Sequence, residues 1–414
     1  MVRVCDAIMG TGKSSAAITY MNEHSNEKFI YITPYLDEAT RIKEGCPNLK
    51  FVEPSNKIPQ YQFRKSAHTA ALIKEGRNIT STHQAFKTYS KETLEDIRKH
   101  GYTLIIDENL DVLEKSDIHP DDIQTLVDAG YITENDGVYT LTNDKYQGEM
   151  FHELFWLMKT RDLIKSQDED DEFLHYWLLP PSLLSSFKNV FILTYLFKGQ
   201  SLHHFMEIYK IPYEYIGVRK SRDGKFYFGD FPSYKPEYVD TLKDMIHILD
   251  NDKLNDVGDS RTALSISWFN RGGEKVFQLK NNIYNCFNNI WKDVPAEKRL
   301  CASYKSTFGK IKGKGYTKAF LNFNSRATNT YRDRTHLAYA ANVFMNVNEK
   351  AFFAKHGVNI DEEAYALCTM LQCIWRSAIR DGHEIYLYIP SRRMRNLLIN
   401  WIEDLSKGVN DNEM

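Results

Sequence analysis

The chain has 414 residues, which is enough for two or three domains with well-formed cores. Hydrophobic residues make up 42% of it and charged residues 26%, which excludes a disordered or fibrous protein and is typical of a soluble globular one. The formal net charge of −2 excludes a protein-wide attraction to polyanions, so that a nucleic-acid site would require a local basic patch.

The six cysteines show no metal-ligand spacing, and we interpret them as small hydrophobic residues of a protein in a reducing compartment. The chain shows neither a signal peptide nor an apolar run long enough to cross a membrane. We therefore expect a cytoplasmic protein without a membrane partner.

Strands and helices alternate through residues 1–215, the expected first domain. The first predicted strand is Val2–Asp6, and a glycine-rich segment and a helix follow it. Further strands, several of them leading into helices, are predicted at residues 28–34, 78–82, 102–108 and 190–196. This alternation predicts an α/β protein whose parallel sheet is covered by helices.

Residues 111–180 differ in character and are predicted to form a small subdomain inserted in the first domain. A short helix over 121–130 precedes a hairpin that turns at Asp136-Gly137. The segment is either a plain structural insertion or a winged-helix-like element that grips DNA. The acidic run at 168–172 is expected to be a solvated loop.

Residues 216–260 are polar and loop-rich, which predicts a linker. A second α/β domain is expected over 261–414. Its predicted elements are a strand at 319–323, a helix near 335–345, a long helix over 362–380, a strand at 384–390 and a helix over 392–405.

The segment Ala-Ile-Met-Gly-Thr-Gly-Lys-Ser at residues 7–14 fits the phosphate-binding loop pattern between a strand and a helix. Its glycines let backbone N–H groups surround phosphates, while Lys13 reaches the β/γ oxygens of ATP and Ser14 ligates Mg²⁺. The predicted nucleotide-binding residues are Gly10, Thr11, Gly12, Lys13, Ser14 and Ser15.

Two acids, Asp107 and Glu108, end the apolar strand that we expect beside the phosphate loop. At such a site the aspartate holds Mg²⁺ together with Ser14, and the glutamate polarises the attacking water.

A polar stripe is predicted on the long helix of the second domain, because Gln372, Arg376 and Arg380 recur at intervals of four residues. The two arginines are candidate arginine fingers for a γ-phosphate bound by the first domain. The alternative is a solvated basic stripe.

The best local patch for nucleic acid lies at residues 305–318, where lysines, aromatic residues and glycines alternate. Its candidate contacts are Lys310, Lys312, Lys314 and Tyr316, and the alternative is a mobile charged hairpin. On the first domain, Thr33-Pro34 and Thr82-His83 follow strand ends and would line the same path.

In this order, the motifs resemble those of superfamily 2 DNA helicases of the phage-encoded type, and the phosphate loop is similar to that of the herpesvirus origin-binding protein. The matching segments are 7–14, Thr33-Pro34, residues 80–83, Asp107-Glu108, residues 194–196, Gln372 with Arg376 and Arg380, and, for the motif V region, 324–329 with 337–342. The resemblance implies two tandem RecA-like domains that hydrolyse ATP with Mg²⁺ in the cleft between them. It also implies movement along single-stranded DNA, with replication proteins as further partners and the host cytoplasm as the location.

The chain departs from the helicase pattern in three places. Its second motif reads Asp-Glu-Asn, Trp375 replaces the usual glycine, and Ile379 stands where the second arginine is usual, so that Arg380 is the substitute. Because only six residues precede the loop, we expect weak discrimination among nucleotide bases. Two other classes fit the first-domain motifs: a DNA-packaging motor ATPase with a nuclease domain, and a nucleotide-dependent switch or loader that does not unwind.

Overall fold

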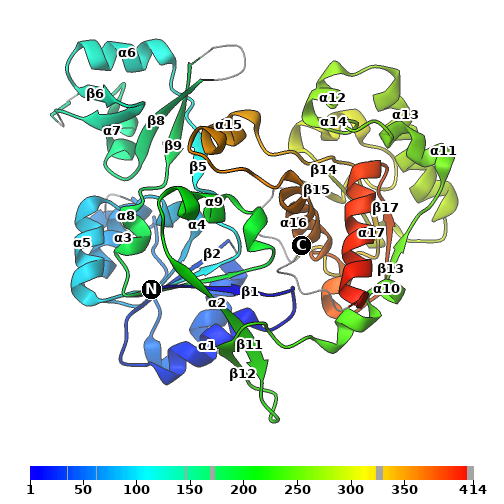
Figure 1. The fold of residues 1–414 in the computed structure, drawn as a ribbon, viewed down its shortest axis with the longest axis horizontal. Coiled ribbons are helices and arrows are strands. Elements are labelled where there is room, and N and C mark those ends of the chain that lie inside the picture. The colour runs from blue at the N-terminus through cyan, green and yellow to red at the C-terminus, as the bar shows by residue number, and fades with distance from the viewer. Residues whose placement is uncertain are drawn as a thin grey trace. The chain divides into compact units, whose positions relative to one another are not determined.

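The computed structural model divides the chain into two compact units, one of Met1–Tyr234 with Asn346–Ile360 and one of Lys235–Met345 with Asp361–Met414 (Figure 1). The description covers all residues except Tyr35, Gln62, Asp144, Gln147, 168–172, 323–329 and 408–414. The predicted acidic loop at 168–172 and the predicted motif V residues 324–329 therefore lie outside the described residues.

A seven-stranded sheet forms the centre of the first unit. Its order is β12 (Phe226–Asp230), β11 (Tyr213–Lys220), β1 (Val2–Asp6), β10 (Asn189–Thr194), β4 (Thr103–Asp107), β2 (Phe29–Thr33) and β3 (Ile79–Thr82). Only the β11–β12 pair is antiparallel. Every residue of β2 and β4 is buried, as expected of parallel strands that are covered on both faces.

The strand that ends in Asp107 is not the neighbour of β1, because β10 lies between β1 and β4. The two strands still end at the same edge of the sheet, since both run parallel to β10. The helices that accompany this sheet are α1 (Lys13–Glu23), α2 (Leu36–Gly45), α3 (Lys65–Lys74), α4 (His83–Phe86), α5 (Lys91–His100), α8 (Ser182–Ser185) and α9 (Ser201–Ile208).

Strands occupy part of the segment that was expected to be a linker. Most of β11 and all of β12 fall within 216–260, and β12 packs on α1. Aromatic residues at alternate positions of β12, Phe226 and Phe228, join the core around Tyr20 and Phe191. β12 is short, and polar residues at its two ends, such as Lys225 and Asp230, hid it in the sequence.

The insertion forms a five-stranded antiparallel sheet, teal in Figure 1, rather than a winged helix. Its order is β5 (Leu113–Lys115), β9 (Phe173–Leu178), β8 (Asp162–Gln167), β7 (Val138–Leu141) and β6 (Ile132–Asn135). The predicted hairpin is present as β6 and β7, with Asp136 and Gly137 both at positive φ. Two helices, α6 (Pro120–Asp128) and α7 (His152–Met158), cover its small core.

The second unit contains a five-stranded parallel sheet. Its order is β13 (Ile246–Ile248), β17 (Ile385–Tyr388), β16 (His336–Tyr339), β14 (Arg299–Ser303) and β15 (Phe320–Asn322). Its helices include α12 (Ile266–Arg271), α13 (Glu274–Asn285), α14 (Phe308–Ile311), α16 (Glu362–Ile374) and α17 (Arg392–Lys407). The helix predicted near 335–345 is wrong, because β16 occupies the middle of the sheet there.

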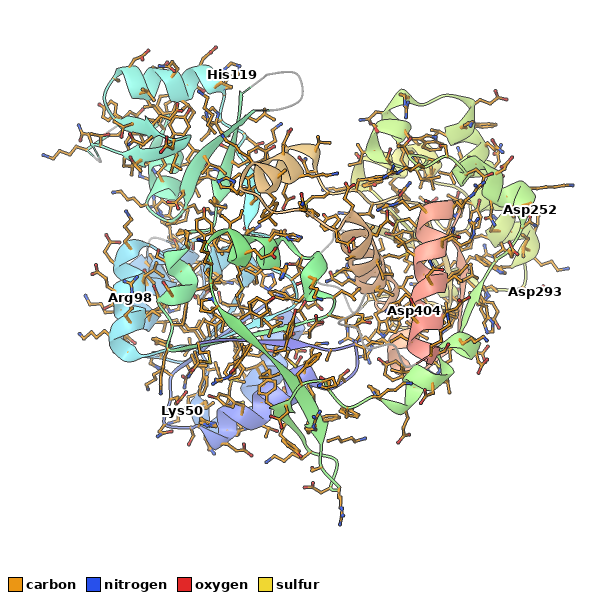
Figure 2. The ribbon with its side chains drawn as sticks, viewed as in Figure 1. Lys50, Arg98, His119, Asp252, Asp293 and Asp404 are labelled. Carbon is orange, nitrogen blue, oxygen red and sulfur yellow. The ribbon has the colours of Figure 1, made fainter. Side chains whose placement is uncertain are left out.

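The short helix α15 (Val347–Lys355) belongs to the first unit, although the chain around it belongs to the second. Charged side chains such as Lys50, Arg98 and His119 lie on the outside of the first unit (Figure 2). All six cysteines are buried and free, as small hydrophobic residues would be. Within the described residues, no helix is both long and apolar enough to cross a membrane.

Candidate functional site

The predicted phosphate loop joins β1 to α1 at the carboxyl edge of the first sheet. Gly10 and Gly12 adopt φ of 78° and 87°, a region that glycine enters without steric cost. The buried hydroxyl of Thr11 donates a hydrogen bond to the carbonyl oxygen of Ile8, at 2.5 Å. The loop is fixed to the neighbouring strand β10, because the backbone N–H of Ala7 donates to the carbonyl oxygen of Thr194 (3.0 Å).

Lys13 begins α1, and its ammonium group folds back over the loop. It donates to the carbonyl oxygens of Ala7 and, at 3.2 Å, of Ile8. Burial lowers the pKa of Lys13, while Asp107, Asp6 and Glu108 act in the opposite direction. A bound phosphate would replace the two carbonyl groups as the partner of this ammonium group.

Asp107 ends β4 and meets the loop from the other side. Its Oδ2 accepts hydrogen bonds from the hydroxyls of Ser14 (3.2 Å) and Tyr31 (2.8 Å). Burial raises the pKa of Asp107, and these two hydroxyls and Lys13 oppose the shift. An octahedral Mg²⁺ with oxygens at about 2.1 Å separates neighbouring ligands by about 3.0 Å, so Ser14 and Asp107 fit as a pair of Mg²⁺ ligands.

Glu108 follows Asp107 in the left-handed backbone region, at φ 67°. Its backbone N–H donates to Leu193 of β10 (2.9 Å), so the turn is fixed to the sheet. Positive φ is uncommon for residues other than glycine, and such conformations concentrate at functional sites. Its carboxylate is near enough to Lys13 to influence the pKa of that side chain.

Three side chains at this edge were missed by the sequence analysis. Tyr31 is buried, and its hydroxyl donates a hydrogen bond to Asp107. Asp6 accepts a hydrogen bond from the N–H of Phe197 (2.9 Å), and burial raises its pKa. Arg41, on α2, donates to the Ser15 hydroxyl (2.7 Å) and pairs with Glu38 (2.9 Å). Only Asp6 carried a signal, as a carboxylate at the end of an apolar strand.

The strand-end residues predicted to contact nucleic acid are largely enclosed. Thr33 is 1% exposed and His83 2%, whereas Pro34 and Thr82 are half-buried. The Thr82 hydroxyl caps α4, accepting a bond from Ala85. His83 does not face outward as expected: its Nε2 lies 2.9 Å from the carbonyl oxygen of Asp107.

The basic patch of the second unit contains exposed lysines and a buried tyrosine. Lys310, Lys312 and Lys314 are exposed, although Lys310 also donates to the Phe269 carbonyl oxygen (2.6 Å). Tyr316 is 1% exposed, and its hydroxyl donates to Ile311 (2.8 Å). Its ring is a core side chain and does not fit the expected stacking role.

The predicted stripe of Gln372, Arg376 and Arg380 does not form on one helix. α16 ends at Ile374, and the Ser377 hydroxyl donates to the Ile374 carbonyl oxygen (2.7 Å) in competition with the helical pattern. Gln372 is half-buried and Arg376 buried, while Arg380 is exposed in a separate turn. The helix predicted over 362–380 is therefore too long by one and a half turns.

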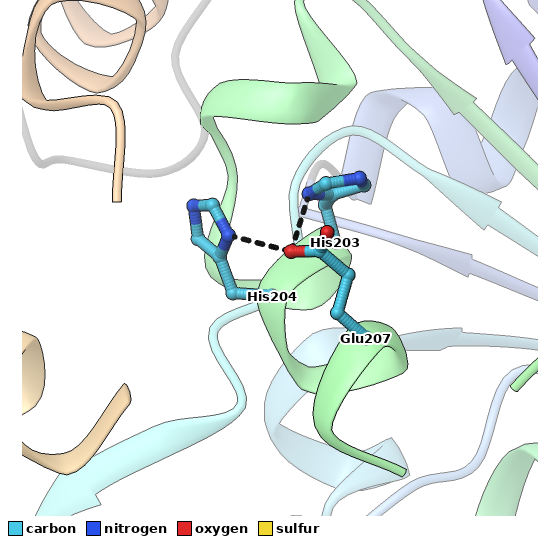
Figure 3. Close-up of side chains that lie close together, drawn as sticks. All are labelled: His203, His204 and Glu207. Carbon is cyan, nitrogen blue, oxygen red and sulfur yellow. Dashed lines mark hydrogen bonds and ion pairs between the residues drawn. The ribbon is translucent and has the colours of Figure 1, made fainter. Parts of the chain in front are cut away.

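A second polar cluster lies on α9, directly after the predicted motif III residues 194–196. The Nδ1 atoms of His203 and His204 lie 3.4 and 3.3 Å from the same oxygen of Glu207 (Figure 3). Among the described residues this is the one group of three that could hold a metal ion. Two imidazoles and one carboxylate are fewer ligands than a structural zinc site uses.

Solved structures that are similar to this chain include two XPD proteins. A solved XPD helicase aligns over 99% of this chain and 95% of its own length, with a TM-score of 0.44 and 10% identity. Xpd4 of S. tokodaii aligns over 97% and 94%, with a TM-score of 0.49 and 11% identity. At such low identity, these alignments do not indicate a shared activity.

The sequence comparisons are more specific. A family model described as the YonV C-terminal Rossmann-like domain matches residues 240–402. The SPbeta prophage-derived protein YonV of Bacillus subtilis (strain 168) is 39% identical, over 97% of this chain and 99% of its own length. This chain therefore belongs to the YonV family.

Proposed function

We propose that this protein is a Mg²⁺-dependent nucleoside triphosphatase that couples ATP hydrolysis to movement along single-stranded nucleic acid. The observation that carries the proposal is the meeting of Lys13, Ser14, Asp107 and Glu108 at the carboxyl edge of one parallel sheet. Such an edge is where open α/β sheets bind their ligands, and these residue types are those of a phosphate-loop triphosphatase.

Each residue has a distinct task in this proposal. The loop N–H groups and the Lys13 ammonium group bind the phosphates and offset the charge that develops during hydrolysis. Ser14 and Asp107 would hold Mg²⁺, which would supply positive charge to offset that of the phosphates. Glu108 accepts a proton from the attacking water and orients it toward the γ-phosphate.

We propose that the protein moves along DNA rather than RNA. The exposed lysines Lys310, Lys312 and Lys314 support an electrostatic grip on phosphates. The prophage origin of YonV supports a role in the replication or recombination of phage DNA. A packaging motor with a nuclease domain is less supported, because the described part of the second unit has no group of three potential metal ligands.

The first experiment is ATP hydrolysis with and without single-stranded DNA, for the wild type, Lys13→Ala and the exposed-lysine control Lys99→Ala. We expect stimulation of about tenfold by the DNA, because the strand completes the catalytic arrangement. Lys13→Ala should abolish hydrolysis with an unchanged circular dichroism spectrum, and Lys99→Ala should behave as wild type. Hydrolysis that does not respond to DNA would instead support a nucleotide-dependent switch.

A further inference from the structure

The structure contains a cavity of about 480 Å³ between the insertion and the first sheet, all within the first unit. One wall is α7 of the insertion, with Glu153 and Trp156. The opposite wall comes from the start of α3, with Arg64 and Lys65, and from the end of β3 and α4, with Thr82 and Gln84. We call this cavity the insertion groove.

We propose that the insertion groove binds an unstacked base of single-stranded nucleic acid together with its flanking phosphates. This inference rests on the proposed function and gives the insertion a role in it. The volume lies in the range of about 300–1,000 Å³ that is usual for small-ligand sites, which suits one nucleotide and is too small for a duplex.

The chemistry of the two walls favours this occupant. Trp156 is half-buried in a largely apolar wall, so one face of its indole ring can stack on a base. Glu153 precedes it by three residues and shares its side of α7, where a carboxylate can accept from an exocyclic amino group of the base.

The rim of the groove carries the charge that phosphates require. Arg64 is exposed and Lys65 half-buried, and neither side chain forms an ion pair with any residue that the structure describes. An apolar peptide would leave both cations without a counter-ion, whereas phosphates flanking a stacked base would neutralise them. Glu153 is the opposing charge, and it lies on the base-binding wall.

The groove is also connected to the triphosphatase site. It opens at the end of β3, which runs parallel to β2 and β4 and ends at the same edge as Asp107. Gln84 and Ala85 line it from α4, and the preceding residue, His83, contacts the Asp107 carbonyl oxygen at 2.9 Å. A strand in the groove therefore contacts the helix whose first residue touches the predicted Mg²⁺ ligand, and we expect occupancy to raise the rate of ATP hydrolysis.

The test measures binding of fluorescein-labelled dC and rC oligonucleotides, whose bases carry an exocyclic amino group, to the full chain by anisotropy, with the stimulation of ATP hydrolysis as a second readout. Trp156→Ala should weaken binding about tenfold and reduce stimulation, while Trp156→Phe, which keeps a ring, should retain most of the affinity. Arg64→Ala with Lys65→Ala should weaken binding and flatten its salt dependence. The two oligonucleotides distinguish DNA from RNA as the source of the ligand.

Arg98→Ala with Lys99→Ala is the matched control, because it removes an exposed arginine–lysine pair on α5, away from the groove. If the wild type binds and is stimulated but both groove variants bind equally well, the groove is not the binding site. The proposed function is then unaffected. A wild type that neither binds nor responds would overturn both. The surface pair Arg64 and Lys65 keeps the test valid if Trp156→Ala fails to fold.

Discussion

Gly12 occupies the tightest position of the phosphate loop. Its φ of 87° is unfavourable for any residue with a side chain. A Cβ added there would lie 2.5 Å from the ring of Phe226, which reaches the loop from β12. The loop is therefore shaped both by its own backbone and by a strand more than two hundred residues away in the sequence.

We predict that Gly12→Ala lowers the free energy of unfolding of the first unit by about 2–4 kcal/mol, as the sum of backbone strain and overpacking. Gly224→Ala is the matched control, because Gly224 has φ 83° but no atom within 4 Å of its added Cβ. Gly224→Ala should lower the free energy of unfolding by about 1–2 kcal/mol, from backbone strain alone. Urea unfolding followed by circular dichroism measures both, and equal losses would show that the Phe226 contact is without effect.

The residues of the candidate site differ in how far sequence could predict them. Lys13 and Ser14 follow from one continuous segment, whose spacing fixes their geometry. The contacts of Tyr31 and Arg41 could not be predicted from the sequence. They depend on the order of the strands in the sheet and on the position of α2 relative to the loop. His83 was assigned to nucleic acid by its place after a strand end and Tyr316 by its residue type, and burial gives both of them other partners.

At the scale of elements, α9 combines aromatic packing with three titratable groups. His203 lies against Phe197 and Tyr213, and His204 lies against Phe353 of α15. Burial lowers the pKa of His203 to about 4, with Glu207 opposing the shift and His204 and Lys198 adding to it. The folded protein thus holds His203 neutral in the range where an unfolded chain would protonate it.

The sign of the pH dependence follows from this depressed pKa. The contribution to stability is complete above the ordinary histidine pKa of 6.5 and is lost as the pH falls from there toward about 4. We predict a loss of about 2 kcal/mol in unfolding free energy between about pH 7 and pH 4.5 from this group. His203→Asn should remove that part of the slope in urea titrations, and an unchanged slope would assign the acid sensitivity elsewhere.

Most elements of the first unit could be predicted because continuous apolar strands ending in turn residues leave little ambiguity. The failures have a shared cause, which is that tertiary burial overrides local preference. Leu337, Ala338 and Tyr339 suit a helix by composition, but they lie between β14 and β17 as a central strand. After α16, the Ser377 hydroxyl and the backbone N–H of Ala378 form hydrogen bonds outside the helical pattern, and periodicity does not contain such a signal.

At the scale of the whole molecule, the two parallel sheets agree with the predicted pair of α/β domains. The return of residues 346–360 to the first unit could not be predicted, because nothing in that segment's composition separates it from its neighbours. The insertion was recognised by its change of character, yet its full antiparallel sheet requires pairing between segments far apart in the sequence, such as Leu113 with Leu178 and Val138 with Ile164.

The candidate arginine fingers named from the sequence lead to a prediction that needs the whole chain. If the second unit supplies charge to the γ-phosphate in the transition state, Arg376→Ala and Arg380→Ala should spare nucleotide binding and lower kcat by about 10³-fold. A fluorescent ATP analogue measures binding, and DNA-stimulated hydrolysis measures kcat. Arg271→Ala, an exposed arginine on α12 of the same unit, is the control.

A fall in kcat has to be interpreted differently for each of the two arginines. Arg380 is exposed, so that its loss removes charge without disturbing a core, and any fall in kcat can be attributed to the charge. Arg376 is 6% exposed, and its loss leaves a gap among buried neighbours, so its variant requires a thermal melting curve beside the kinetics. A normal kcat in both variants would exclude the finger role. A loss confined to Arg380→Ala would identify Arg380 as the arginine that acts on the γ-phosphate, and Arg376 as a structural residue of the turn after α16.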